Sequence, residues 1–336
     1  MAKFDYIISA VDVHTGGEPA RIVLSGMPSL PGITMADKKQ YFAGHFDYLR
    51  TLLLHEPRGH KDMFGVILGP ATTDQADYGI IFMDSTGYID MCGHSVMAAG
   101  TALIEMGIVA AKEPETKIVF DTPAGLVESY ARVAHNRVTE ISISNVPCFL
   151  YQREVEINVQ NLGKICIDVS FGGNFFALVP ADRLGVSVHP DNYAMLVTYG
   201  MAIKEAVNRK ISIQHPIKRH ITKVELTEIY EKTDPTAFFS KSAVIFGQGQ
   251  LDRCPCGTGT SAAMAMLYSK GQLPLEVEFV NESIIGTRFK GKLVRETHVG
   301  DFAAVCPIVT GNSYIIGFQQ LVVDPDDPLK YGFLIP

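Results

Sequence analysis

The chain has 336 residues, of which 47% are hydrophobic and 19% are charged, and its net charge is −7. Such a composition is that of a folded globular protein with room for about two domains, and it excludes an intrinsically disordered chain. The basic residues form no cluster, no apolar run reaches the length of a membrane span, and the first residues lack a signal pattern. We therefore expect no nucleic-acid partner, no membrane partner and no leader segment.

The first half of the chain is predicted to alternate strands with one amphipathic helix. Thr34 and Asp37 have the spacing of an N-terminal capping box. The helix that follows carries Phe42, Phe46, Leu49 and Leu53 on one face and ends near residue 56. Paired glycines at Gly16-Gly17 mark a tight turn between the first two strands. The predicted strands are 3–11, 20–25, 64–68, 78–83, 117–121, 126–133 and 138–144.

A cysteine followed by glycine and a helix of small residues occupies residues 90–107. Cys92 stands before Gly93, and the predicted helix ends at Gly107. The first N–H groups of a helix lack partners within it and carry a partial positive charge, so an anion can bind beside the thiol. We expect this helix end to lower the pKa of the thiol.

The same order of landmarks returns in the second half. Cys256 begins a second cysteine–glycine–helix element at an offset of 164 residues, and Gly172-Gly173 repeats the glycine pair. A helix with Pro190 in its first turn carries Leu196, Gly200, Ile203 and Val207, and Val280 and Gly286 repeat the spacing of Val119 and Gly125. The sequence therefore predicts an internal duplication. Its two domains are residues 1–155 with Cys92 and residues 156–336 with Cys256, and the terminal segment can cross back to the first domain.

Two equivalent thiols that face each other across an interdomain cleft suit stereochemical inversion. One thiolate can remove an α-proton while the opposite thiol delivers a proton to the other face. The N–H groups at the two helix starts, at Gly93, His94, Gly257 and Thr258, are predicted to bind a carboxylate. The two thiols should then titrate as a coupled pair.

Four motifs resemble those of the cofactor-independent proline racemase family, which includes hydroxyproline 2-epimerases and trans-3-hydroxyproline dehydratases. The motifs are Asp12-Val13-His14-Thr15-Gly16-Gly17-Glu18, Met91-Cys92-Gly93-His94, Gly172-Gly173-Asn174 and Asp252-Arg253-Cys254-Pro255-Cys256-Gly257-Thr258-Gly259-Thr260. The last of these carries Cys254 where the family usually has serine.

The resemblance implies the fold, the chemistry and the roles of several residues. The fold would be the α+β diaminopimelate epimerase-like fold, with two pseudo-symmetric α/β domains, mixed sheets wrapped round a central helix, and the active site between them. Cys92 and Cys256 would be the acid/base thiols, and His94 and Asp252 would hold the ring nitrogen. The resemblance implies a homodimer that uses neither a cofactor nor a metal ion. Because both thiols are present, racemisation or epimerisation is favoured over dehydration.

Two phenylalanines indicate the substrate. Phe64 and Phe246 match the family positions at which proline racemases place aromatic walls around an unsubstituted ring. An apolar wall would leave a ring hydroxyl unpaired, at a cost of about 1–3 kcal/mol. We therefore expect proline as the substrate, with 4-hydroxyproline as the alternative and trans-3-hydroxy-L-proline dehydration as a third possibility.

Other interpretations of these residues remain open from the sequence alone. Cys92 and Cys256 could be inert buried thiols, and Cys254 with Cys256 and His94 could bind a metal, although their spacing matches no standard zinc site. Phe64 and Phe246 could be ordinary core residues, His14 could be a core histidine, and the whole chain could be a non-catalytic amino-acid-binding protein. Six cysteines are ordinary for a reducing compartment, which favours a cytoplasmic location.

Overall fold

The computed structural model describes residues 4–234 and 238–335, and these residues divide into two compact units. Unit 1 comprises Met1–Asp90, His94–Ile141 and Asn312–Pro336. Unit 2 comprises Met91–Gly93 and Ser142–Gly311. The chain passes between the units at 141/142, whereas the predicted boundary at 155/156 falls within a strand of unit 2. The C-terminal segment does belong to the first unit.

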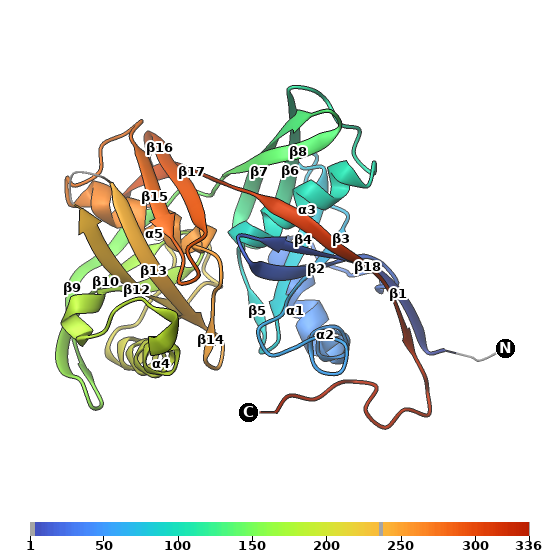
Figure 1. The fold of residues 1–336 in the computed structure, drawn as a ribbon, viewed down its shortest axis with the longest axis horizontal. Helices are drawn as coiled ribbons and strands as arrows, with labels where there is room; N and C mark the ends of the chain where they lie inside the picture. Colours follow the sequence, from blue (N-terminus) through green and yellow to red (C-terminus); the bar gives the residue numbers. More distant parts are fainter. Residues whose placement is uncertain (1–3, 235–237, 336) are drawn as a thin grey trace. The chain divides into compact units, whose positions relative to one another are not determined.

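Unit 1 is a mixed sheet with three helices (Figure 1). Strand β1 pairs antiparallel with β2 and with the C-terminal β18, β2 pairs parallel with β3, and β3 pairs antiparallel with β4. Strand β4 also pairs antiparallel with β5 and parallel with β6, and β6 pairs antiparallel with β7. The elements are β1 (Tyr6–Thr15), β2 (Glu18–Ser25), α1 (Met35–His45), α2 (Asp47–Leu54), β3 (Phe64–Gly69), β4 (Tyr78–Asp84), β5 (Tyr88–Ile89), α3 (Gly93–Glu105), β6 (Glu115–Thr122), β7 (Gly125–Ala134), β8 (Arg137–Ser144, which enters unit 2) and β18 (Ser313–Val323).

Unit 2 has the same pairing scheme. Strand β10 pairs antiparallel with β11, β11 parallel with β12, and β12 antiparallel with β13. Strand β13 pairs antiparallel with β14 and parallel with β15, and β15 pairs antiparallel with β16. The elements are β9 (Phe149–Val159), β10 (Gly163–Phe171), β11 (Phe175–Pro180), η1 (Ala181–Leu184), η2 (Pro190–Asn192), α4 (Tyr193–Lys210), β12 (Val224–Asp234), β13 (Phe239–Phe246), β14 (Gln250–Leu251), α5 (Gly257–Ser269), β15 (Glu278–Glu282), β16 (Arg288–Val299) and β17 (Phe302–Gly311).

The two small-residue helices are the innermost elements. Residues 91–104, which include most of α3, are buried, and so is α5 from Gly257 to Met266. A helix that is apolar on every side belongs in a core, and alanine and glycine let strands approach it closely. Within unit 2, α5 packs against β9, β10, β16 and β17, and α4 packs against β12, β13 and β9. This arrangement places a helix at the centre of the unit 2 sheet.

The single amphipathic helix predicted after Thr34 is two helices. The predicted capping box is confirmed, because the Thr34 side chain accepts from the N–H of Asp37 and the Asp37 carboxylate accepts from the N–H of Thr34. Helix α1 ends at Phe46, whose φ of −131° is not helical, and α2 starts directly after it. Phe42 and Leu49 are buried in the same core cluster on either side of the break. The periodicity therefore identified the buried face but not the change of helix direction.

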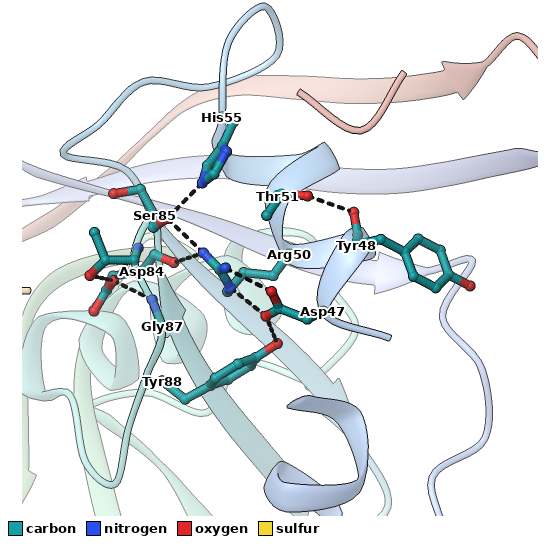
Figure 2. A network of polar contacts seen from close by, with 10 residues as sticks. Asp47, Tyr48, Arg50, Thr51, His55, Asp84, Ser85, Gly87 and Tyr88 are labelled. Atoms are coloured by element: carbon teal, nitrogen blue, oxygen red, sulfur yellow. Dashed lines mark hydrogen bonds and ion pairs between the residues drawn. The ribbon is translucent and has the colours of Figure 1, made fainter. Parts of the chain in front are cut away.

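Helix α2 is fixed to the β4–β5 turn by the buried Arg50 (Figure 2). Its guanidinium donates to both carboxylate oxygens of Asp47 at 2.7 and 2.9 Å, and to the carbonyls of Asp84 and Ser85 at 3.1 and 2.6 Å. The Tyr88 hydroxyl also donates to Asp47, at 2.7 Å. Burial opposes ionisation of Asp47, but the bonds from Arg50 and Tyr88 outweigh it and lower the pKa of this carboxyl group.

Among the described residues, no helix is long and apolar enough to cross a membrane.

Candidate active site

Cys256 lies at the N-terminus of the buried helix α5. It is the N-cap residue, with a φ of 60° that is uncommon for a residue other than glycine. Its Sγ accepts from the N–H of Gly259 at 3.4 Å and lies 3.5 Å from the Thr258 hydroxyl. The thiol therefore takes one of the helix N–H groups that lack a partner within the helix.

Burial determines the acidity of this thiol. Burial and then the nearby Asp252 raise the pKa of Cys256 well above its ordinary value, although bonds from Thr258 and Gly259 act in the opposite direction. The prediction that the helix end lowers this pKa is therefore wrong for Cys256. A thiolate loses the solvation of water when it is buried, and two weak hydrogen bonds to sulfur do not replace that solvation.

Cys254 and Asp252 support the loop that leads to Cys256. The N–H of Cys256 donates to Sγ of Cys254 at 3.3 Å, and the Cys254 thiol donates to Oδ1 of Asp252 at 3.6 Å. The N–H of Asp252 bonds to the carbonyl of Val244 at 2.8 Å, which continues the sheet from β13. Cys254 therefore links the Asp252 carboxylate to the backbone of the Cys256 turn.

The segment before α3 is held by the second glycine pair. The Asn174 amide donates to the Met91 carbonyl at 2.6 Å, one residue before Cys92. A Cβ on Gly173 would lie 2.9 Å from Cβ of Met91, and a Cβ on Gly172 would lie 2.1 Å from the Thr258 carbonyl oxygen. The motif Gly172-Gly173-Asn174 thus fits between Met91 and the start of α5, where larger side chains have no room.

The residues that follow the two cysteines are in direct contact within unit 2. A Cβ on Gly93 would lie 2.9 Å from Cα of Gly257, and a Cβ on Gly257 would lie 3.1 Å from Cα of Gly93. The first distance is too short for a real side chain and the second is tighter than most Cβ contacts, so glycine at both positions lets the backbones meet. Cys92 and Cys256 each directly precede one of the two glycines of this contact.

His94 and Phe64 lie in unit 1. The ring of Phe64, the first residue of β3, meets the His94 imidazole edge-on, with centroids 4.6 Å apart and planes at 87°. Burial lowers the pKa of His94 to about 3, so the ring is neutral at physiological pH. The Thr15 hydroxyl donates to the His94 carbonyl at 3.0 Å, which connects the first glycine-pair motif to α3.

The predicted site residues are thus distributed over both units. Phe64 and His94 belong to unit 1. The His14 ring lies against the Tyr314 ring at a tilt of 32°, with centroids 5.3 Å apart, and its Nδ1 accepts from the N–H of Gly17 at 3.3 Å. The other predicted site residues belong to unit 2, and they are Cys92, Gly93, Phe246, Asp252, Cys256, Gly257 and Thr258.

One buried acid beside Cys256, Glu228, was not predicted from the sequence. Glu228 lies in β12, and a Cβ on Gly259 would be 2.7 Å from its Oε2. A signal was available, because Glu228 precedes Cys256 by 28 residues, as Phe64 precedes Cys92. Strand periodicity did not reveal on which face of β12 this carboxyl group lies.

Comparison with known proteins gives full-length matches. The family model described as proline racemase matches residues 10–334. A proline racemase of Acetoanaerobium sticklandii is 51% identical over 99% of this chain and 100% of its own length. A 4-hydroxyproline 2-epimerase of Streptosporangium roseum is 41% identical over 98% of both chains. The crystal structure of a hydroxyproline epimerase from Agrobacterium vitis with bound trans-4-hydroxy-L-proline has a TM-score of 0.94 at 32% identity, and the match covers 100% of this chain and 97% of that one.

Proposed function

Because the chain belongs to the proline racemase family, we propose that it interconverts L- and D-proline with Cys92 and Cys256 as its acid/base pair. The observation that carries this proposal is the contact between the backbones of Gly93 and Gly257, the residues that directly follow the two cysteines. One thiolate removes the α-proton, and the other thiol protonates the opposite face of the planar carbanion. The roles of the two thiols reverse for the other enantiomer.

The substrate carboxylate is bound in this proposal by the backbone at the two helix starts. The N–H groups of Gly93, His94, Gly257 and Thr258 are the donors, because the first N–H groups of a helix have no carbonyl partners within it. Their partial positive charge also stabilises the second negative charge that develops on the carboxylate when the α-proton leaves.

The ring nitrogen is held in this proposal by His94 and Asp252. The Asp252 carboxylate favours the protonated secondary amine, and a neutral His94 can accept a hydrogen bond from it. The bound ammonium group then offsets the negative charge of Asp252 that raises the pKa of the Cys256 thiol. Substrate binding thus promotes the thiolate that the reaction needs. No cofactor or metal ion takes part in these steps.

The proposal also states where the substrate binds, how the protein assembles and in which compartment it works. The substrate lies between the two domains, a placement supported by the passage of the chain from unit 2 to unit 1 directly after Gly93. The protein is a homodimer, supported by a row of exposed apolar residues on β18, among them Ile316 and Phe318. A cytoplasmic location is supported by its six free cysteines.

Proline is the first substrate because Phe64 and Phe246 are the proposed walls of the ring pocket, and both are buried phenylalanines. A ring hydroxyl against such walls loses hydrogen bonds to water, at about 1–3 kcal/mol. The second candidate is 4-hydroxyproline, which is favoured by the 41% identity to an epimerase and by the epimerase structure with bound trans-4-hydroxy-L-proline.

The test is proton exchange in D2O. L-proline incubated with the purified protein should lose optical rotation and gain deuterium at Cα, and the kcat/KM for proline should exceed that for trans-4-hydroxy-L-proline. Cys92→Ser and Cys256→Ser should each abolish inversion while ligand binding persists. Absence of exchange with either proline enantiomer would refute the racemase proposal. Turnover of the hydroxylated substrate alone would establish the epimerase, and a pyrroline product from trans-3-hydroxy-L-proline would establish the dehydratase. Binding without turnover of any of these substrates would point to an amino-acid-binding protein.

A further inference from the structure

Glu228 is a buried acid with no role in the reaction as described so far. Its residue exposure is 1%, and neither carboxyl oxygen has a hydrogen-bond partner among the described residues. It lies within β12, between its parallel neighbour Leu178 on β11 and its antiparallel neighbour Val244 on β13. A buried and unpaired carboxylate is costly, so its presence calls for an explanation.

The carboxyl group of Glu228 reaches the first turn of α5 beside Cys256. A single point, the position of a Cβ on Gly259, lies 2.7 Å from Oε2 of Glu228 and 3.3 Å from Sγ of Cys256. The carboxyl oxygen and the sulfur are therefore no more than about 6 Å apart. Gly259 leaves the space between them open, because any side chain there would contact both groups.

The polar groups around Glu228 are occupied with one another. Asn281 donates to the Ser242 hydroxyl at 3.0 Å, to the Thr260 hydroxyl at 3.0 Å and to the Pro255 carbonyl at 3.1 Å. This network fixes the loop before Cys256. Ser242 and Asn281 lie near enough to Glu228 to favour its ionised form slightly, yet neither forms a hydrogen bond to it.

The charges that face Glu228 make the neutral acid its resting form. Burial, and then the charge of Asp252, raise the pKa of Glu228 to about 8, against the smaller opposing effect of Ser242 and Asn281. On its own strand the nearest titratable group is Tyr230, whose pKa is raised by burial first.

Charges more distant from Glu228 act on Tyr230. The carboxylates of Asp168 and Asp182 oppose ionisation of Tyr230, and Arg183 favours it. Lys270 is paired with Asp168 in an ion pair. Asp252 is the ionisable group that raises the pKa of Glu228, and Glu228 in turn is one of the groups that raise the pKa of Cys256.

We propose that Glu228 is a positioning residue for Cys256. The Glu228 carboxyl group lies beside Gly259 as the neutral acid, so the Cys256 thiolate can form without a second negative charge next to Asp252. This inference rests on the proposed acid/base role of Cys256. Ionisation of Glu228 at alkaline pH adds that second charge and opposes the thiolate. At about 6 Å and an effective dielectric constant of about 20, a unit charge shifts a neighbouring pKa by about two units.

The experiment measures the ionisation of Cys256 without any turnover. The rate of iodoacetamide alkylation at Cys256 is followed from pH 6 to 11 by peptide mass spectrometry in the wild type and in Glu228→Gln. Glutamine has the size of glutamate and carries no charge, so the alkylation curve of the variant should move to lower pH by about one to two units. The matched control is Glu231→Gln on the same strand, whose side chain accepts from the N–H of Val188 at 2.6 Å.

Three outcomes decide the inference. A shift in Glu228→Gln but not in Glu231→Gln supports it. Superimposed curves, or a rate lowered by the same factor at every pH, overturn it, because a residue that only fills space does not change where the thiol titrates. If Glu228→Gln does not fold, infrared spectra of the wild type decide: absence of a protonated carboxyl band at pH 7 overturns the inference. Because alkylation needs no substrate, a protein inactive on proline could still show the shift.

Discussion

Replacement of Glu228 by glutamine should change the pH dependence of stability, because this acid is neutral in the folded protein. Its pKa is about 8 in the fold, against 4.5 for the ordinary group. Between those values the unfolded chain carries the charge and the folded chain does not. The contribution of Glu228 to stability is therefore fully present below pH 4.5, falls as pH rises through this window, and is fully lost above pH 8.

The magnitude follows from the width of the window. Each pH unit between the two pKa values costs about 1.4 kcal/mol, so from pH 5 to pH 8 the wild type should lose about 4 kcal/mol relative to Glu228→Gln. The constant cost of burying a glutamine amide cancels in this comparison, because it does not depend on pH. Other titrating groups are common to the two proteins and cancel as well.

Urea unfolding at pH 5, 6, 7 and 8, followed by circular dichroism, measures the difference in free energy of unfolding at each pH. The difference should move steadily in favour of the variant as pH rises. A difference that stays constant within about 0.5 kcal/mol from pH 5 to pH 8 would refute the reasoning, since it would mean that Glu228 is ionised in the folded protein throughout.

Three further substitutions and one control test other parts of the structure. Gly93→Ala should lower kcat/KM for proline at least about tenfold and lower the free energy of unfolding by about 1–3 kcal/mol through overpacking. The control is Gly44→Ala, where a Cβ would meet nothing within 4 Å. In urea unfolding this control should be neutral or stabilising by up to about 1 kcal/mol. Arg50→Ala should lower the free energy of unfolding by roughly 2–4 kcal/mol at pH 7, because it leaves buried carbonyls unpaired. The loss should be smaller at acid pH, where Asp47 becomes protonated and its ion pair with Arg50 is absent from the wild type as well. Phe318→Glu should convert the proposed dimer to a monomer with unchanged circular dichroism, as judged by light scattering.

The sequence predicted most of the elements because local patterns encode them. The capping box at Thr34 is a signal four residues long, and the burial of Leu196, Ile203 and Val207 on α4 follows from helical periodicity. The break at Phe46 was not predictable in this way, because the apolar residues before and after it continue one stripe. Only the packing of both helices in one core decides where the axis turns.

The electrostatics of the candidate site differ from what the sequence predicted. The duplication predicted Cys92 and Cys256 as partners, and the structure adds a contact between the glycines that follow them. The pKa of Cys256 was expected to be lowered, because a helix end is visible in the sequence and burial is not. Glu228 was not predicted for the same reason, because the effect of its carboxyl group on Cys256 depends on which face of β12 is turned toward α5.

The asymmetry between the two halves leads to a last prediction. Phe64 and Glu228 precede Cys92 and Cys256 by the same 28 residues, and each lies on the strand that pairs parallel with its predecessor. The residue 28 positions before the cysteine is therefore aromatic in the first half of the sequence and acidic in the second. Glu228→Gln should change kcat and KM to different extents for L- and D-proline, because each enantiomer begins its reaction at a different thiol.

The equal free energies of L- and D-proline limit how far the two directions can differ, and this limit distinguishes proline from 4-hydroxyproline as the substrate. Two enantiomers have equal free energies, so the equilibrium constant is one, and kcat/KM must be equal for L- and D-proline in the wild type and in every variant. The two 2-epimers of 4-hydroxyproline are diastereomers, for which this equality need not hold. Initial rates measured from both directions by polarimetry test both statements. If Glu228→Gln changed kcat by the same factor, and KM by the same factor, in both directions, the two thiols would have equivalent surroundings in the reaction, and the proposed role of Glu228 beside Cys256 would be wrong.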